Sequence, residues 1–115
     1  MSTLLYILEG KTPVVCNDLH VWAKWIGKAA QRRVADDTVG NIRVSTVFLG
    51  IDHRFVGNGP PVLFETMLFG GASDNEMRRC CTYDEALAMH RAAVDGVREL
   101  MDESKLAMQR ARAES

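Results

Sequence analysis

The stretch RVSTVFLGIDHRFVGNGPPVLFETMLFGG, residues 43–71, contains two apolar alternations joined by a loop rich in glycine and proline. Alternation with a period of two is typical of β-strands. Neither face of residues 43–51 is strongly polar, so we expect a central strand there, paired with residues 61–69. Glu65 would lie in the middle of the second strand, where a carboxylate needs a partner, and nearby arginines are candidates.

Upstream of these strands, residues 3–16 (TLLYILEGKTPVVC) predict a hairpin that turns at Gly10. Residues 18–34 then predict a helix capped by Asn17, because apolar residues recur three and four positions apart. This spacing places Trp22 and Trp25 on one face. We expect that face to pack on the sheet, since aromatic stripes at helical spacing are usually core, although a Trp-lined binding groove is the alternative. A second turn is expected at residues 39–41.

Downstream, residues 75–81 (NEMRRCC) predict one more short strand. Thr82 and Glu85 then have the spacing of a capping box, which predicts the start of a helix. No proline and only one glycine, Gly96, interrupt the sequence before about residue 112. A helix of this length extends about 45 Å, whereas a compact chain of this size has a radius of gyration of about 13 Å. The helix is therefore expected to project beyond the rest of the domain.

This long helix carries a seam, because Leu87, Val94, Met101 and Met108 recur every seven residues. An amphipathic helix end that its own domain cannot bury is most economically buried on another copy of the chain. The sequence thus predicts self-association into a homo-oligomer. The alternative is a frayed, polar helix end, since Met and Ala are weak seam residues.

At 115 residues the chain is long enough for one domain only. The expected fold is α+β: residues 1–81 form an antiparallel sheet with one packed helix at 18–34, and residues 82–113 form the long C-terminal helix. The formal net charge of −1 gives no general attraction to nucleic acid or to an anionic membrane. Any anion site must come from a local cluster of arginines.

The sequence has no apolar run long enough to span a bilayer, and its start, MSTLLYILEGK, lacks the features of a signal peptide. We therefore expect a cytoplasmic protein. Cys16, Cys80 and Cys81 are odd in number and two are adjacent, which disfavours a structural disulfide and lacks the ligand spacing of a zinc site. No metal and no cofactor are expected.

Catalysis is not expected. A nucleophile needs a base within hydrogen-bond reach and a third group that orients the base. The available combinations are Cys80 or Cys81 with His90, and a serine at position 45 with residues 52 and 53; none lies in a recognised motif. His90 falls on the apolar row of the long helix, where a hydrogen-bonded core histidine is the commoner outcome.

Ligand binding without chemistry fits the residues better. A nucleotide needs an apolar surface for its base and forked cations for its phosphates, which Phe and Arg supply. The candidate ligand-binding residues are Phe48, His53, Arg54, Phe64, Arg78, Arg79 and Arg91. For Phe48 and Phe64 the alternative is a place in the sheet core. Arg79 and Arg91 flank the capped start of the long helix, where unpaired amides favour anions.

The motifs RVSTVFLGIDH and LFETMLFGG, followed by a Thr-capped helix that contains His90, resemble a set of short phage and prophage proteins. The segment YILEGKTPVVCNDLHVWAKW also fits, so the resemblance covers roughly residues 6–100. The segment MRRCCT is more basic and richer in cysteine than this pattern.

In its sheet followed by a long helix, the chain is similar to the first Thoeris anti-defence family. The resemblance implies a sponge in the host cytoplasm that binds cyclic ADP-ribose isomers, and in some members CBASS cyclic nucleotides, without cleaving them, and that assembles from dimers. Two other classes stay open: a phage-encoded inhibitor that docks on a host defence protein, and a small phage morphogenesis or assembly protein.

Overall fold

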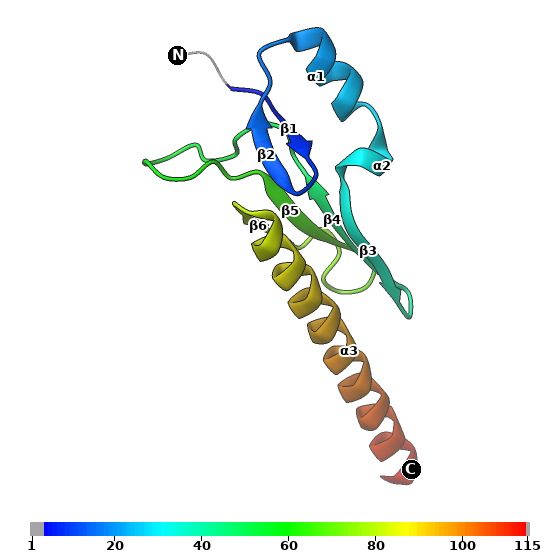
Figure 1. The fold of residues 1–115 in the computed structure, drawn as a ribbon. Helices are drawn as coiled ribbons and strands as arrows, with labels where there is room; N and C mark the ends of the chain where they lie inside the picture. Colours follow the sequence, from blue (N-terminus) through cyan, green and yellow to red (C-terminus); the bar gives the residue numbers. More distant parts are fainter. Residues whose placement is uncertain (1–3, 115) are drawn as a thin grey trace.

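The computed structural model describes residues 4–114 and has an α+β fold, as the sequence predicts (Figure 1). An N-terminal hairpin precedes a four-stranded antiparallel sheet, and the chain ends in a long helix. The hairpin strands are β1 (Tyr6–Glu9) and β2 (Thr12–Val15), and the sheet order is β3 (Arg33–Val39), β4 (Ile42–Phe48), β5 (Phe64–Phe69) and β6 (Met77–Cys80). The predicted hairpin and the short strand that becomes β6 are both confirmed.

Strand β4 is central, as predicted, and pairs with β5 in the register Val44 to Leu68, Thr46 to Thr66 and Phe48 to Phe64. Side chains at directly opposed positions share a face of the sheet. On this face Val44, Thr46 and Phe48 are all buried.

The predicted helix over 18–34 is wrong in extent. The structure has α1 (Leu19–Ile26) and a single turn, α2 (Ala29–Arg32), and β3 begins at Arg33. Asp18, not Asn17, caps α1, because its carboxylate accepts hydrogen bonds from the amides of His20 and Val21. Gly27 ends α1, and from Arg33 the chain extends along β4, where its backbone groups find partners.

The tryptophan face of α1 packs on the sheet, as expected. The Trp25 ring meets Phe48 edge-on with ring centroids 5.6 Å apart. The indole N–H of Trp22 donates to the carbonyl of Gly50 at 3.3 Å. Together with the hairpin, α1 covers the end of the sheet where Phe48, Leu63 and Phe64 form one core cluster.

Helix α3 (Tyr83–Glu114) begins at the predicted capping box, in which Thr82 and Glu85 exchange hydrogen bonds of 3.1 Å between side chain and amide. Its first half covers the sheet, where Val94 and Val97 pack on Val44 in a second core cluster. Every residue from 102 to 114 is exposed, and α3 runs out of the domain (Figure 1).

The projecting helix gives an elongated molecule of 65 × 30 × 20 Å with a radius of gyration of 17.9 Å. A compact chain of this length would measure about 13 Å. At the far end of the sheet, Gly40 makes the β3–β4 turn with a φ of +59°, and a Cβ there would lie 2.5 Å from the Met101 methyl carbon. Among residues 4–114, no helix combines the length and apolar character needed to cross a bilayer.

Candidate functional site

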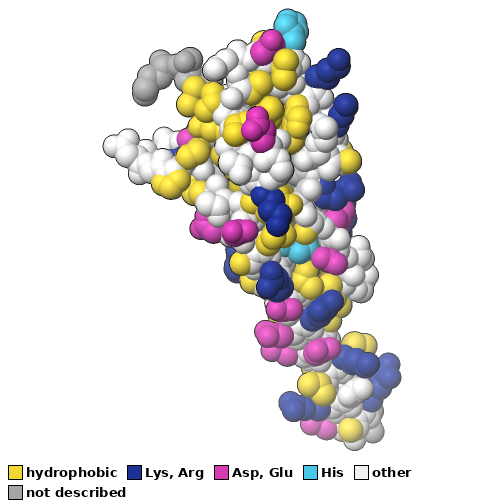
Figure 2. Space-filling view, viewed as in Figure 1, with side chains coloured by type: hydrophobic (Ala, Val, Ile, Leu, Met, Phe, Trp, Pro, Cys, Tyr) yellow, Lys and Arg dark blue, Asp and Glu magenta, His cyan; other side chains and the backbone are white. Residues whose placement is uncertain are grey.

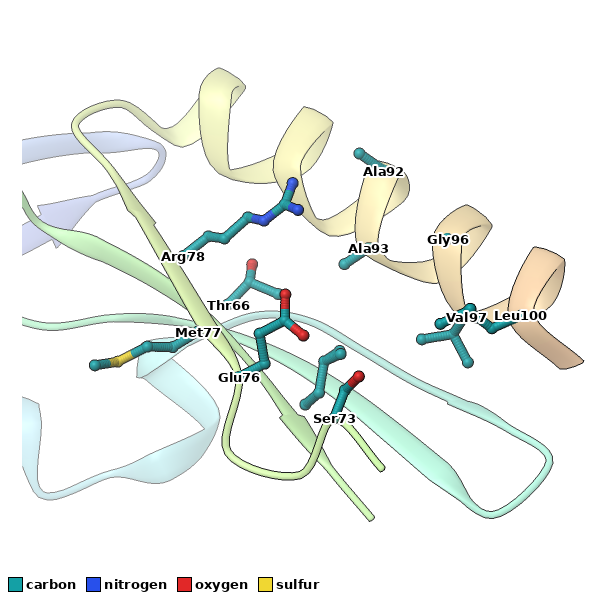
Figure 3. A pocket seen from close by; sticks show the side chains of 11 residues that line it. Thr66, Ser73, Glu76, Met77, Arg78, Ala92, Ala93, Gly96, Val97 and Leu100 are labelled. Carbon is teal, nitrogen blue, oxygen red and sulfur yellow. The ribbon is translucent and has the colours of Figure 1, made fainter. Parts of the chain in front are cut away.

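A groove of about 290 Å³ runs between α3 and the strands β5 and β6 (Figure 3). We call it the α3–β6 groove. Its lining residues are Thr66, Leu68, Ser73, Glu76, Met77, Arg78, Ala92, Ala93, Gly96, Val97 and Leu100. A concave, mostly apolar surface with a few polar groups is the usual form of a small-molecule site.

The groove exists because α3 is built from small side chains along this side. Ala92, Ala93 and Gly96 face the space, and a Cβ added at Gly96 would meet no atom within 4 Å. A second groove of about 470 Å³ shares Leu68 and Leu100 with the first and continues along α3 to Met108. An elongated ligand therefore has continuous surface beside the helix.

Arg78 is the cation of the α3–β6 groove, and it extends from β6 toward α3 (Figure 3). Its side chain makes no ion pair or hydrogen bond within residues 4–114. Its cross-strand neighbour is Thr66, whose side chain also lines the groove. A guanidinium without a carboxylate partner has all its donors available for an anion.

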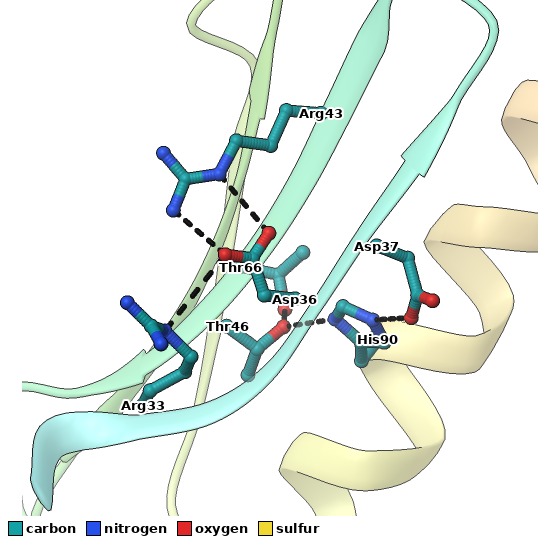
Figure 4. Close-up of polar contacts among 7 residues, drawn as sticks. All are labelled: Arg33, Asp36, Asp37, Arg43, Thr46, Thr66 and His90. Atoms are coloured by element: carbon teal, nitrogen blue, oxygen red, sulfur yellow. Dashed lines mark hydrogen bonds and ion pairs between the residues drawn. The ribbon is translucent and has the colours of Figure 1, made fainter. Parts of the chain in front are cut away.

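The arginines on the opposite face of the sheet are all engaged. Arg79 donates to Glu65 at 2.9 Å, which confirms the predicted need of Glu65 for an arginine partner. Arg43 binds Asp36 through two hydrogen bonds of 3.0 and 2.8 Å, and this contact lowers the pKa of Asp36 (Figure 4). Because a carboxylate already balances the charge of each of these guanidinium groups, they attract a phosphate less strongly than Arg78 does.

Beneath α3 a chain of hydrogen-bonded polar groups links β5, β4, α3 and β3 (Figure 4). Its members on β5, β4 and α3 are buried, and its β3 end is an exposed carboxylate. The hydroxyl of Thr66 meets that of Thr46, which lies 2.7 Å from Nδ1 of His90. Nε2 of His90 lies 2.7 Å from the carboxylate of Asp37. His90 is thus a hydrogen-bonded core histidine, as expected.

Phe48 and Phe64 do not form the ligand platform that was one reading of the sequence. Both rings are fully buried, and each meets an aromatic neighbour edge-on, Trp25 for Phe48 and Tyr83 for Phe64. The hairpin, α1 and the start of α3 cover the face on which they lie. The alternative, a place in the sheet core, is the correct one.

His53 and Arg54 stand at the base of the 51–62 loop, where they hold the loop together. Nδ1–H of His53 donates to the carbonyl of Ile51, and Nε–H of Arg54 donates to that of Pro60. Asp52 accepts from the amides of Arg54 and Val62 at 2.8 Å, and these contacts lower its pKa. The loop end then presents Phe55 and Val56, which are 79% and 86% exposed.

The structure therefore does not bring the predicted site residues together. Arg78 lies in the α3–β6 groove, and Arg79 lies on the other face of the sheet. Arg91 lies on the side of α3 that faces β3, in a hollow lined also by Asp37, His90 and Arg98. His53 and Arg54 lie in the 51–62 loop, which adds no residue to the groove lining.

Sequence reasoning missed Thr66, Asp37 and the small residues Ala92 and Gly96. Two signals were present: hydroxyl residues at inward positions of both apolar strands, and a run of small residues in a helix otherwise rich in long side chains. Neither identifies a groove until the register of the strands is known.

Two further chemistries find little support. Burial raises the pKa of the Cys80 thiol to about 11, so it is a poor nucleophile at neutral pH. In the described part of the chain, no group of three or more His, Cys, Asp or Glu side chains is arranged to hold a metal ion.

Comparison of the chain with protein-family models, with curated proteins and with solved structures found no match.

Proposed function

We propose that the chain binds a small anionic nucleotide, of the cyclic ADP-ribose class, in the α3–β6 groove and holds it without chemical change. The observation that carries the proposal is Arg78, a guanidinium with no partner among residues 4–114, at the wall of an apolar groove. Arg78 would take the phosphates, and the surface of Leu68, Val97 and Leu100 would take the base. In the setting that the sequence resemblance implies, sequestration would remove a signal of host defence.

Binding without turnover is supported by the burial of Thr46. Thr46, His90 and Asp37 have the order of a nucleophile, a base and an acid, but Thr46 is fully buried. A substrate carbonyl or phosphate cannot approach its hydroxyl in this arrangement. Incubation with a cyclic ADP-ribose isomer, followed by heat denaturation, should therefore return the ligand intact by mass spectrometry. Linear ADP-ribose as the main product would show hydrolysis instead.

Arg78→Ala is the direct test of the binding site. Loss of a charge-assisted contact costs about 1.5–3 kcal/mol, so the affinity for a cyclic ADP-ribose isomer should fall about tenfold to a hundredfold in titration calorimetry. Gly96→Leu should weaken binding as well, because its side chain would enter open groove space while favouring the helix.

The matched control is Arg110→Ala, which removes an exposed arginine from the projecting end of α3, outside the groove lining. It should leave the affinity unchanged. Equal losses for Arg78→Ala and Arg110→Ala would indicate a diffuse charge effect, and unaltered affinity in Arg78→Ala would place the site elsewhere.

The 51–62 loop favours a second candidate, an interaction protein. Its base is fixed by the hydrogen bonds of Asp52 and Arg54, and its end exposes Phe55 and Val56 side by side in sequence. Rigid, exposed aromatic residues are typical anchors of protein interfaces. Under this alternative, Phe55→Ala would abolish binding of the partner protein. The same change would not alter the affinity for a cyclic ADP-ribose isomer.

We propose further that copies of the chain associate through the projecting half of α3. Residues 102–114 are all exposed, and hydrophobic side chains lie among charged ones along this end (Figure 2). On the seam, Met108 is 60% exposed. The seam that packs on the sheet in the first half of α3 extends through Met101, which still contacts the sheet, to Met108, which is exposed.

A further inference from the structure

The sheet-side wall of the α3–β6 groove carries two opposite charges close together. Glu76 and Arg78 both line the groove, and both side chains extend from the sheet toward α3 (Figure 3). Glu76 lies directly before β6, and Arg78 lies within it. Residues two positions apart in an extended segment share a face and are about 6.6 Å apart along the chain. A carboxylate and a guanidinium are therefore neighbours on this wall.

Neither of these charged groups has a partner in the structure. The side chains of Glu76 and Arg78 make no ion pair or hydrogen bond within residues 4–114, including with each other. On the other face of the same two strands, by contrast, Glu65 and Arg79 pair at 2.9 Å. The charges are thus matched on one face of β5 and β6, whereas those on the groove face are available to a ligand.

The loop between β5 and β6 fixes the backbone of Glu76. The Glu76 amide donates to the carbonyl of Ser73 at 3.0 Å, and its carbonyl accepts from the amide of Leu68 at 2.9 Å. In the same loop, the Asp74 carboxylate accepts from the amide of Gly70 at 2.7 Å. Because the backbone is already held, only the Glu76 side chain has to be ordered when a ligand binds, which lowers the entropic cost of binding.

A carboxylate beside a guanidinium suits a ligand in which hydrogen-bond donors lie next to an anionic group. An ionised carboxylate only accepts hydrogen bonds, and acidic side chains bind ribose hydroxyls in this way in dinucleotide-binding folds. The forked guanidinium matches phosphate oxygens. We infer that Glu76 and Arg78 form a ribose-phosphate subsite, in which Arg78 binds the phosphate and Glu76 accepts from the hydroxyls of the attached ribose. The inference rests on the proposed function, because it names the chemistry that the same groove recognises.

The same two charges determine which ligands the subsite disfavours. An inorganic phosphate carries negative charge on all sides, so Glu76 repels the oxygens that Arg78 does not hold. A nucleoside without a phosphate lacks the anion that Arg78 binds. The subsite therefore favours a sugar phosphate over either of its halves, and Glu76 is a specificity-determining residue.

Adenosine monophosphate and its 2′,3′-dideoxy analogue are the probes of this inference, because they differ only in the two ribose hydroxyls. The unmutated chain should bind adenosine monophosphate about tenfold more tightly, the effect of a hydrogen bond to a charged group. Glu76→Ala should abolish this preference. It should also bind the dideoxy analogue at least as tightly as the unmutated chain does, because repulsion of the phosphate is removed. NMR titration of the backbone amides measures each dissociation constant.

The matched control is Glu103→Ala, which removes one carboxylate from an exposed position of α3 outside the groove lining. It should keep the preference for adenosine monophosphate. Equal affinities for the two probes in the unmutated chain, or no binding of either, would overturn the inference. The same holds if Glu76→Ala keeps the preference, or if both variants lose it equally.

A cyclic ADP-ribose isomer separates failure of this inference from failure of the proposed function. Binding of the isomer that depends on Arg78 but not on Glu76 would support the proposed function and overturn the subsite. If the isomer did not bind, but the preference for adenosine monophosphate depended on Glu76, the proposed function would be refuted and the subsite supported.

Discussion

Replacing Phe48 or Phe64 by alanine is expected to lower the free energy of unfolding by about 3–5 kcal/mol, the usual cost of removing a buried aromatic ring. Both rings are fully buried in the cluster where the hairpin, α1, the sheet and α3 meet. A single domain of this size has a total stability of about 5–15 kcal/mol, so either variant should be largely destabilised. Urea denaturation followed by circular dichroism measures the change.

The control is Phe55→Ala, which removes the same side chain from the exposed end of the 51–62 loop. It should alter the free energy of unfolding by no more than about 0.5 kcal/mol. If Phe48→Ala or Phe64→Ala left the stability unchanged but abolished ligand binding, the interpretation of these rings as a ligand platform would be favoured. Their assignment to the core would then be wrong.

Phe48 and Phe64 also show how much of the fold can be predicted from the sequence. Alternation predicted β4 and β5, and the facing of Phe48 and Phe64, correctly. It could not say which face is covered, because both faces of β4 carry apolar residues. That depends on where the hairpin, α1 and α3 pack, and these contacts join segments far apart in the chain.

Strand β3 was missed for a different reason. Residues 33–39 include Asp36, Asp37 and Thr38, so the segment lacks the apolar alternation of a buried strand. It is an edge strand, paired only with β4 among residues 4–114, and its polar residues are tolerated there. The apolar spacing of α1 continues through Ala29 and Ala30, and for this reason the predicted helix extended too far.

The candidate site was less predictable than the fold. Thr46 and Thr66 are 20 residues apart in sequence, and Thr46 and His90 are 44 apart. No local spacing encodes such contacts, since they depend on strand register and on the rotation of α3 over the sheet. Arg78 was a candidate from the sequence, but only the register of β5 and β6 shows that it lies opposite Thr66 while Arg79 lies opposite Glu65 and pairs with it.

Met108→Asp is expected to raise the dissociation constant for self-association at least about a hundredfold, because it would place a carboxylate in an apolar contact between copies. Met108 is 60% exposed within one chain, so its replacement should not disturb the monomer. Val94, on the same seam, is unsuitable because it is buried against the sheet and a charge there would unfold the domain itself. Sedimentation velocity at micromolar concentration measures the species present.

Leu106→Asp supplies the control, because two residues along a helix place side chains about 200° apart. Leu106 is exposed to a similar degree but lies off the seam of Met101 and Met108. It should leave the oligomer intact. If both variants dissociated equally, the contact would depend on overall helix charge and not on the seam. A monomeric unmutated protein would contradict the proposed self-association and would favour the alternative of a polar helix end without a partner.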